Sequence, residues 1–317
     1  MQVLVTGGAG FIGSNLTDQL LADGHSVVVL DDFNDYYQPD FKRQNVLQMK
    51  KNSNCRIVEG DITSRQTVRD LFGSHRFDMV IHLAARAGVR ASLKDPFLYQ
   101  RVNVEGTLNI LEAMREFGVK KLTFGSTSSV YGSNTKIPFS ESDPLFNTIS
   151  PYAATKLAGE ALCRSYSHLH KLDIAVVRFF TVYGPRGRPD MAMYLFAKQL
   201  AKGLPIQVFG DGSSSRDYTY VDDIVQGVAA TIRREFGYEI FNLGESDTIQ
   251  MRDLIQLLEQ TMGVKAQIER LPDQPGDVPH TFADISKAQR ILGYNPKTKV
   301  RAGVPKLIQW LKENGRI

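Results

Sequence analysis

The first 178 residues alternate between short runs rich in Val and Ile and longer amphipathic segments. The predicted strands are Val3–Thr6, Ser26–Leu30, Cys55–Glu59, Met79–His82, Lys121–Gly125 and Ile174–Arg178. The predicted helices between them are Phe11–Ala22, Phe41–Lys51, Ser64–Phe72, Phe97–Phe117 and Tyr152–His168. Strands that alternate with helices indicate βαβ units, and apolar strands are typical of a parallel sheet covered on both faces. The alternation therefore predicts an α/β fold with a doubly wound parallel (Rossmann) sheet, which binds ligands at the carboxyl ends of its strands.

After Arg178 the alternation stops. Residues 184–189 are rich in Gly, Pro and Arg, and a Gly/Ser loop follows at 210–215. The elements predicted beyond this point are helices near 190–202, 222–235, 251–262, 286–292 and 304–313, and a strand near 217–221. We therefore predict a Rossmann domain over residues 1–180, joined by part of 217–240, and a smaller α/β substrate-binding cap domain over 181–317.

Composition narrows the class of protein. The 317 residues are 42% hydrophobic and 23% charged, with a net charge of +4, as in soluble globular proteins. We expect no nucleic-acid partner, because no basic run stands out, and no membrane span or signal peptide, because no long apolar stretch or basic leader occurs. The spacing of the two cysteines and six histidines predicts no metal site, and reduced thiols favour a cytoplasmic location.

A glycine-rich turn follows the first predicted strand and opens the first predicted helix. It comprises Gly7, Gly10, Phe11, Ile12 and Gly13. Glycines at these positions allow a tight turn and a close approach of the backbone to a pyrophosphate, which the helix N-terminus attracts. Asp31 at the end of the second strand can accept hydrogen bonds from an adenosine ribose, which favours NAD over NADP. The alternative is an ordinary wound sheet that binds no dinucleotide.

The ends of the third and fourth strands are further candidates for the cofactor site. By position, Asp61 and Ile62 would lie near an adenine, and Leu83, Ala84 and Ala85 near the pyrophosphate. For Asp61 the alternative is a cap of the helix that follows it.

Tyr152 and Lys156 are four residues apart, so on a helix their side chains share one face. Two nearby cations, this ammonium and an oxidised nicotinamide, would lower the pKa of the phenol and make Tyr152 a usable base. Tyr194 and Lys198 have the same spacing but lie beyond the predicted sheet, so we interpret them as packing and surface residues. What distinguishes Tyr152 and Lys156 from the second pair is the hydroxyl-rich segment 124–132 upstream of Tyr152. It places hydroxyl groups at the end of the fifth strand, beside the expected nicotinamide.

Together these segments resemble the extended short-chain dehydrogenase/reductase family. The resemblance rests on Gly-x-x-Gly-x-x-Gly, a Ser/Thr cluster ending in Val-Tyr-Gly and Tyr-x-x-x-Lys, and in the cap on Ser215-Arg216-Asp217-Tyr218 and Gly276-Asp277-Val278-Pro279. It implies that Arg216 and Asp277 hold a uridine diphosphate, and that the chain pairs through helices 97–117 and 152–168 as a homodimer. The alternative for Arg216 is a surface salt bridge with Asp217 or Asp222.

Within this family, the residues after Thr127 indicate the reaction. Dehydratases and decarboxylases carry a carboxylate there, whereas this chain has Ser128 and Ser129, so a 4-epimerase is favoured. Segments 82–92, 181–191 and 274–279 are similar to UDP-glucuronate 4-epimerases. That similarity implies that Arg188 binds the sugar carboxylate, supported by Thr181 and Ser128, with Ser129 also on the substrate side and Arg90 near the diphosphate. For Arg188 the alternatives are a phosphate contact or an exposed loop charge.

The resemblance implies a specific mechanism. Tyr152, ionised by Lys156 and aided by Thr127 and Ser128, would remove the 4-hydroxyl proton while the C4 hydride passes to NAD. The 4-keto sugar would rotate and regain the hydride on its other face, which interconverts UDP-glucuronate and UDP-galacturonate. Alternatives are a 4-epimerase of UDP-glucose or UDP-N-acetylglucosamine, a UDP-glucuronate decarboxylase, and a non-enzymatic NAD-binding regulator.

Overall fold

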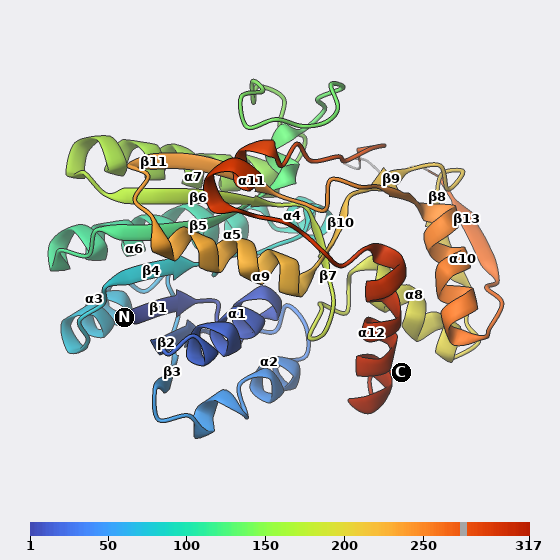
Figure 1. Cartoon of the computed structure of the whole chain (residues 1–317), viewed down its shortest axis with the longest axis horizontal. Helices are drawn as coiled ribbons and strands as arrows, with labels where there is room; N and C mark the ends of the chain where they lie inside the picture. Colours follow the sequence, from blue (N-terminus) through green and yellow to red (C-terminus); the bar gives the residue numbers. More distant parts are fainter. Residues whose placement is uncertain (273–277) are drawn as a thin grey trace.

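The computed structural model describes residues 1–272 and 278–317, and a seven-stranded sheet runs through its centre (Figure 1). The strands are β1 (Gln2–Thr6), β2 (Ser26–Asp31), β3 (Cys55–Glu59), β4 (Met79–His82), β5 (Lys121–Thr127), β6 (Asp173–Phe179) and β11 (Tyr238–Leu243). Every pair in this sheet is parallel, and the order is β11-β6-β5-β4-β1-β2-β3. The strand order reverses between β1 and β4, which is where a wound sheet binds its ligand. The predicted α/β fold with a parallel sheet is confirmed.

Two strand predictions were incomplete. The seventh strand, β11, was not predicted, because its residues Tyr-Glu-Ile-Phe-Asn-Leu include two polar side chains in an edge strand. In addition, β5 continues two residues beyond the predicted end, to Thr127. Thr127 thus ends the strand at the carboxyl edge of the sheet.

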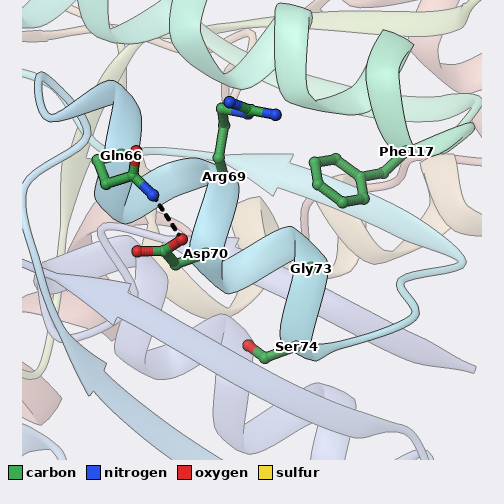
Figure 2. Close-up of a pocket in the computed structure, with 6 residues that line it drawn as sticks. All are labelled: Gln66, Arg69, Asp70, Gly73, Ser74 and Phe117. Carbon is green, nitrogen blue, oxygen red and sulfur yellow. Dashed lines mark hydrogen bonds between the residues drawn. The ribbon is translucent and has the colours of Figure 1, made fainter.

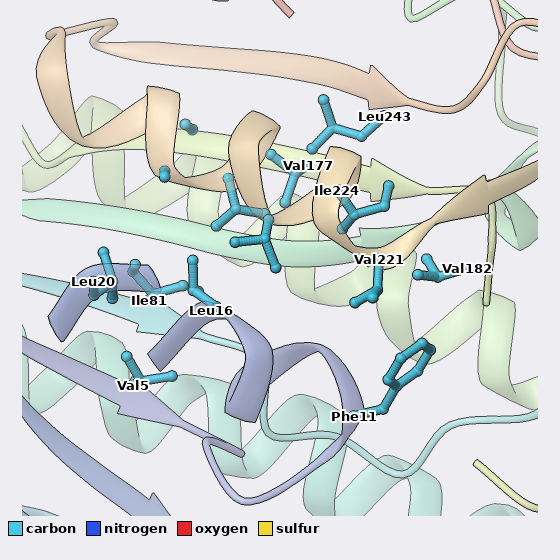
Figure 3. Close-up of a cluster of buried hydrophobic side chains, with 14 of the residues drawn as sticks. Val5, Phe11, Leu16, Leu20, Ile81, Val177, Val182, Val221, Ile224 and Leu243 are labelled. Carbon is cyan, nitrogen blue, oxygen red and sulfur yellow. The ribbon is translucent and has the colours of Figure 1, made fainter. Parts of the chain in front are cut away.

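Helices cover both faces of the sheet (Figure 1). On one face α1 (Phe11–Ala22) packs against α9 (Val221–Ala230), and on the other lie α3 (Arg65–Ser74), α6 (Gly106–Phe117) and α7 (Pro151–His170). A core cluster fills each side. Figure 3 shows part of the first cluster, to which Leu16 and Leu20 of α1, Ile224 of α9 and Val177 of β6 contribute. This burial of two apolar faces explains why the strands are apolar on both sides.

Two predicted helices are interrupted. Segment 41–51 forms α2 (Pro39–Asn45) and the short turn η1 (Met49–Lys51), and segment 97–117 forms α5 (Pro96–Gln100), the π-helical turn η2 (Arg101–Glu105) and α6. The π turn buries Asn103, whose amide donates to and accepts from the main chain of Arg86 at 3.0 and 2.8 Å. An inserted π turn is typical of helices next to functional sites.

The second half of the chain builds a separate set of short elements beside the sheet (Figure 1). These are β7 (Thr181–Tyr183) with β10 (Tyr218–Tyr220), β8 (Ile206–Phe209) with β13 (Ile268–Leu271), β9 (Ser215–Arg216) with β12 (Ile249–Gln250), and the helices α8 (Ala192–Ala201), α10 (Met251–Met262) and α12 (Val300–Glu313). The helix α11 (Ser286–Leu292) instead returns to the sheet, where it packs against β11 and α9. Residues of α8, α10 and α12 share a third core cluster. The division of the chain near residue 180 stays a prediction, which this separate cluster supports.

Candidate active site

The glycine-rich turn brings the backbone of three segments close together. Gly7 has φ +69°, and a Cβ there would lie 2.7 Å from the main-chain nitrogen of Ala84. A Cβ on Gly13 would lie 2.2 Å from the carbonyl oxygen of Gly7. Gly10 precedes α1 without a side-chain cap, so the first amides of the helix, at Phe11 and Ile12, point outward for an anion.

Asp31 is buried at the carboxyl end of β2 and is held from three sides. Its Oδ2 accepts the amide of Ala9 at 3.1 Å, and its Oδ1 accepts the amide of Phe33 at 2.9 Å and the ammonium of Lys42 at 3.0 Å. A carboxylate has about four acceptor positions, so one remains for a ribose hydroxyl. Sequence analysis missed Lys42, although a lysine in the helix after an acidic strand end was a signal for an ion pair.

The segment after β4 borders the glycine turn. Leu83, Ala84 and Ala85 follow β4, and the amides of Leu83 and Ala84 donate to Thr6 on β1. Next to them Arg86 has a buried Nε without a hydrogen-bond partner among the described residues. Sequence analysis gave Arg86 no role, although it lies within segment 82–92, a few residues after an apolar strand.

Asp61 and Ile62 follow β3, at the same edge of the sheet. Asp61 is exposed and accepts the amide of Thr63 at 2.8 Å, while Ser64 caps α3. The alternative interpretation of Asp61 as the helix cap is therefore wrong. Ile62 is buried, and a Cβ on Gly106 of α6 would lie 2.6 Å from its side chain.

Tyr152 lies in the first turn of α7, at the carboxyl edge of the sheet, and its phenol meets the end of β5. Burial raises the pKa of Tyr152 above its ordinary value, whereas a hydrogen bond with Thr127 and the positive charge of Arg188 lower it. Lys156 is buried one turn later, with Nζ 4.2 Å from the centre of the Phe124 ring, and burial lowers its pKa to about 8. Thr127 and Tyr152 thus lie together at this edge of the sheet.

The expected contact between Lys156 and the phenol differs in the structure. Over the described residues Lys156 forms no hydrogen bond with Tyr152, and its charge acts on His82, whose pKa falls to about 3, chiefly because of burial. The side chain of Lys156 extends down α7 toward β4 and β5, so Arg188 is the cation whose charge reaches the Tyr152 phenol.

Arg188 lies in the loop after β7 and is paired. Its Nε and Nη2 donate to the two carboxylate oxygens of Asp190 at 3.0 and 2.6 Å, and the guanidinium lies 5.2 Å from the centre of the Tyr36 ring. Nη1 forms no hydrogen bond within the described residues. Tyr99 packs edge-on against Tyr152 at 6.2 Å, so aromatic rings surround the phenol and the arginine. Sequence analysis found Arg188 but missed Asp190, Tyr36 and Tyr99.

Two of the predicted nucleotide-sugar residues, Arg90 and Arg216, contact short elements of the second half of the chain. On α4 (Val89–Lys94), Arg90 places its guanidinium 4.4 Å from the ring centre of Phe209 on β8. Arg216 on β9 donates at 3.0 Å to the carbonyls of Ser215 and Pro279. Within the described residues it forms no salt bridge with Asp217 or Asp222, which argues against the surface-pair alternative. Asp277 lies outside the described residues.

Thr181, Ser128 and Ser129 complete the predicted substrate side. Thr181 begins β7, opposite Tyr218 of β10. Ser128 and Ser129 form the start of the short helix η3 (Ser128–Tyr131), directly after β5. The amide of Ser129 donates to the Thr127 hydroxyl at 3.2 Å, so this turn is fixed to the end of the strand.

The pocket in Figure 2 is separate from the candidate site around Tyr152. It lies between α3 and α6, with a volume of about 410 Å³, and is lined by Gln66, Arg69, Asp70, Gly73, Ser74 and Phe117. Gln66 donates to Asp70 at 2.7 Å, so two of its polar groups already bind each other. The C-terminal ends of α3 and α6 lead into β4 and β5, which places the pocket near the amino edge of the sheet, away from Tyr152.

Comparison with known proteins decides the family. Residues 3–244 match the model of the NAD dependent epimerase/dehydratase family. The chain belongs to this family. A UDP-glucuronate 4-epimerase of Thermodesulfobacterium geofontis is 46% identical over 312 residues, which cover 98% of this chain and 96% of the relative.

Solved structures agree with this family. The crystal structure of UDP-glucuronic acid 4-epimerase from Bacillus cereus, in complex with UDP-glucuronic acid and NAD, has a TM-score of 0.94 at 37% identity and covers 99% of this chain and 100% of that chain. UDP-glucose 4-epimerase from Thermotoga maritima, with UDP-glucose, has a TM-score of 0.92 at 32% identity and covers 99% of each chain. The resemblance that the sequence carried is therefore confirmed. Because the two epimerases fit almost equally well, the substrate has to be argued from side chains.

Two further observations bound the site. No group of three His, Cys, Asp or Glu side chains that could hold a metal ion occurs within residues 1–272 and 278–317. Across the same residues, none of the helices combines the length and the apolar character needed to cross a membrane.

Proposed function

We propose that the chain interconverts UDP-glucuronate and UDP-galacturonate as an NAD-dependent 4-epimerase. The observation that carries the proposal is the meeting of Tyr152, Thr127 and Arg188 at the carboxyl edge of the sheet. The Tyr152 phenol can move the proton of the sugar 4-hydroxyl. The neighbouring cation, Arg188, favours the phenolate form of Tyr152 and can also bind a uronate carboxylate. The similarity to the Thermodesulfobacterium enzyme supports this choice of substrate.

The residues around the glycine turn fit a dinucleotide. A Cβ on Gly7 or Gly13 would collide with main-chain atoms, so glycine at these positions lets the turn pack tightly enough to bring its amides to a pyrophosphate. The amides of Phe11 and Ile12 would hold the phosphates, Asp31 the adenosine ribose, and Arg86 adds a buried cation beside them. When bound, NAD supplies reversible oxidation at sugar C4.

The chain's own residues perform the proton transfer and hold the sugar. Tyr152 takes the proton of the 4-hydroxyl and later returns it, while the Thr127 hydroxyl stabilises the phenolate. Arg188 would bind the sugar carboxylate through Nη1, supported by Ser128 and Thr181 from neighbouring turns. Arg90, Arg216 and Asp277 would hold the uridine diphosphate, with Ser129 on the sugar side.

Decarboxylation and dehydration are disfavoured at this site. No carboxylate follows Thr127, where Ser128 and Ser129 stand, and the acid on α7, Glu160, is bound by Arg178 at 2.7 Å. A base for the C5 proton is therefore missing from this turn. Arg188 would also keep the carboxylate of the β-keto acid intermediate from leaving as carbon dioxide.

The test separates the substrates by their products. We would incubate the protein with UDP-glucuronate, UDP-glucose, UDP-N-acetylglucosamine and UDP-xylose and identify the products by chromatography. We expect UDP-galacturonate from UDP-glucuronate and little turnover of the neutral sugars. Rapid conversion of UDP-glucose alone, or release of UDP-pentose, would overturn the proposal, and no product at all would favour a non-enzymatic regulator.

The role of Arg188 has a matched control in the same loop. Arg186 pairs with Asp18 at 2.6 Å, away from Tyr152. We expect Arg188→Ala to lower kcat/KM for UDP-glucuronate by about 100-fold, because a charge-assisted pair is lost, and to release some UDP-pentose. Arg186→Ala should leave kcat/KM unchanged and release no UDP-pentose. Full activity of Arg188→Ala without pentose would assign the carboxylate to other residues.

We also propose a cytoplasmic homodimer. Its support is apolar surface on the helices that flank α7, where Leu93, Phe97 and Leu108 are 50%, 84% and 37% exposed. Cys55 and Cys163 are both free thiols, which suits a reducing compartment. Light scattering on the purified protein would show twice the chain mass of 35.4 kDa, and Phe97→Lys should halve it. A wild-type monomer would refute the dimer.

A further inference from the structure

A buried ion pair lies between α7 and β6, next to the proposed site. Arg178 on β6 and Glu160 on α7 are 1% and 3% exposed. The guanidinium donates through Nε and Nη2 to the two carboxylate oxygens, at 3.0 and 2.7 Å. Burying such a pair costs desolvation free energy, and a protein with apolar side chains of similar volume in its place is often as stable or more stable. Stability alone therefore does not explain why these two residues are charged.

The pair connects α7 to the end of β5. Glu160 is one turn beyond Lys156 and two turns beyond Tyr152, so the three side chains follow one face of the helix. Ser126, the residue before Thr127, donates its hydroxyl to Glu160 Oε1 at 2.5 Å. The carboxylate thus fixes how far α7 extends along β5 and how it is rotated, and these two parameters decide whether Tyr152 reaches Thr127.

The other end of the pair holds the turn after β5. Arg178 donates through Nη1 to the hydroxyl of Tyr131 at 3.0 Å, and that hydroxyl donates to Asn242 on β11 at 2.7 Å. Tyr131 and Asn242 are 1% and 0% exposed. Tyr131 closes η3, the turn that begins with Ser128. One buried pair is therefore bonded to every segment that carries the predicted proton-transfer residues: α7, the end of β5, and η3.

We propose that Glu160 and Arg178 are positioning residues for epimerisation: they hold α7, β5 and η3 in the register in which the Tyr152 phenol meets the Thr127 hydroxyl. The proposal rests on the proposed epimerase function. A misplacement of reacting groups by about 1 Å can cost about 100-fold in rate, so a register that is only slightly loose would be visible in kcat.

The test replaces the pair without leaving a buried charge. Glu160→Leu combined with Arg178→Met keeps the volume apolar, and Ser126→Ala removes only the link to β5. The control is Thr123→Val, which removes an equally buried hydroxyl of the same strand, hydrogen-bonded at 2.6 Å to Thr231 and distant from Tyr152. Each holoenzyme is measured for melting temperature and for kcat and KM with UDP-glucuronate.

We expect the double variant to fold and to lose about tenfold or more in kcat, with KM within about threefold, because positioning acts on the transition state. Ser126→Ala should lose about threefold in kcat, and Thr123→Val should lose none, even if its melting temperature falls as far. Wild-type kcat in the folded double variant would overturn the proposal. If that variant does not fold, equal kcat losses in Ser126→Ala and Thr123→Val would overturn it, and a loss confined to Ser126→Ala would support it.

The activity of the wild type tests the proposed function independently of the variants. If the wild type fails on UDP-glucuronate but converts a neutral UDP-sugar, the proposed substrate is wrong, and the same variants are compared on that sugar. A wild type inactive on every UDP-sugar refutes both the proposed function and the positioning role.

Discussion

Two helices of this protein carry a tyrosine and a lysine at the same spacing, Tyr152 and Lys156 on α7 and Tyr194 and Lys198 on α8. On α7 the phenol is half-buried and meets the Thr127 hydroxyl, and the lysine is buried over an aromatic ring. On α8 the phenol is buried in the apolar cluster of the cap, and the lysine is exposed. The interpretation of the second pair as packing and surface is confirmed. Because the two pairs share their spacing and differ in position, we infer that the end of a parallel strand, and not the spacing, would make the first pair reactive.

The largest difference in kcat between the two helices should come from removing their tyrosine hydroxyls. Tyr152→Phe removes the group that carries the proton, so we expect kcat with UDP-glucuronate to fall by about 1,000-fold or more. Tyr194→Phe removes a hydroxyl from the cap cluster, and kcat should stay within about twofold, as for substitutions away from a site. Steady-state kinetics on the two proteins checks both. Comparable losses would show that the cap pair takes part in the reaction.

The buried lysine should be needed for activity but should cost stability. Burial holds the pKa of Lys156 at about 8, below its ordinary 10.5, so the charged form is disfavoured in the folded protein. We expect Lys156→Met to lower kcat by about 100-fold. With excess NAD at pH 7, the same variant should melt at a higher temperature than the wild type.

The sign of the pH dependence follows from the same shift. Between pH 8 and 10.5 the unfolded chain binds more protons at Lys156 than the folded chain, so the wild type gains stability as the pH rises. The melting advantage of Lys156→Met should therefore be full below pH 8 and disappear through this window. An advantage that stays constant with pH would assign it to packing.

Removing the Thr127 hydroxyl beside the Tyr152 phenol, the proposed base, should make the α7 pair resemble the α8 pair. The hydrogen bond from Thr127 lowers the pKa of Tyr152, so Thr127→Val raises it. Because the base works as a phenolate, the acid limb of the kcat profile should move to higher pH, and kcat at pH 7 should fall by about tenfold. Thr123→Val on the same strand should leave the profile in place. An unmoved acid limb in Thr127→Val would assign it to another group.

Local sequence was sufficient for most of the sheet and for proposing which residues move the proton. The Val- and Ile-rich runs predicted six strands within about two residues, because strands buried on both faces must be apolar throughout. Tyr152 was predicted from its spacing to Lys156 and the hydroxyl-rich segment upstream, and Thr127 from the family resemblance. The edge strand β11 escaped prediction because its polar Glu239 and Asn242 interrupt the apolar pattern.

What could not be predicted depends on contacts between distant segments. Arg188 and its partner Asp190 share the loop after β7, but Tyr36, whose ring lies against Arg188, comes from the loop after β2, and only the folded sheet brings the two loops together. The same holds for Lys156, whose side chain turns toward Phe124 of β5, as no spacing along α7 could show. The spacing of residues along a helix predicts which side chains share a face, but it does not predict which residues of other segments they contact.

The smallest effect should come from the second lysine, and it completes the comparison. Lys198 is exposed in the last turn of α8, where a cation interacts favourably with the helix dipole by about 0.5 kcal/mol. Lys198→Met should therefore lower the melting temperature by about 1 °C and leave kcat unchanged, measured beside Lys156→Met under the same conditions. The two substitutions are chemically identical and differ only in burial and in distance from β5. If both lowered kcat alike, position at the carboxyl edge would not be what makes a Tyr-x-x-x-Lys pair reactive.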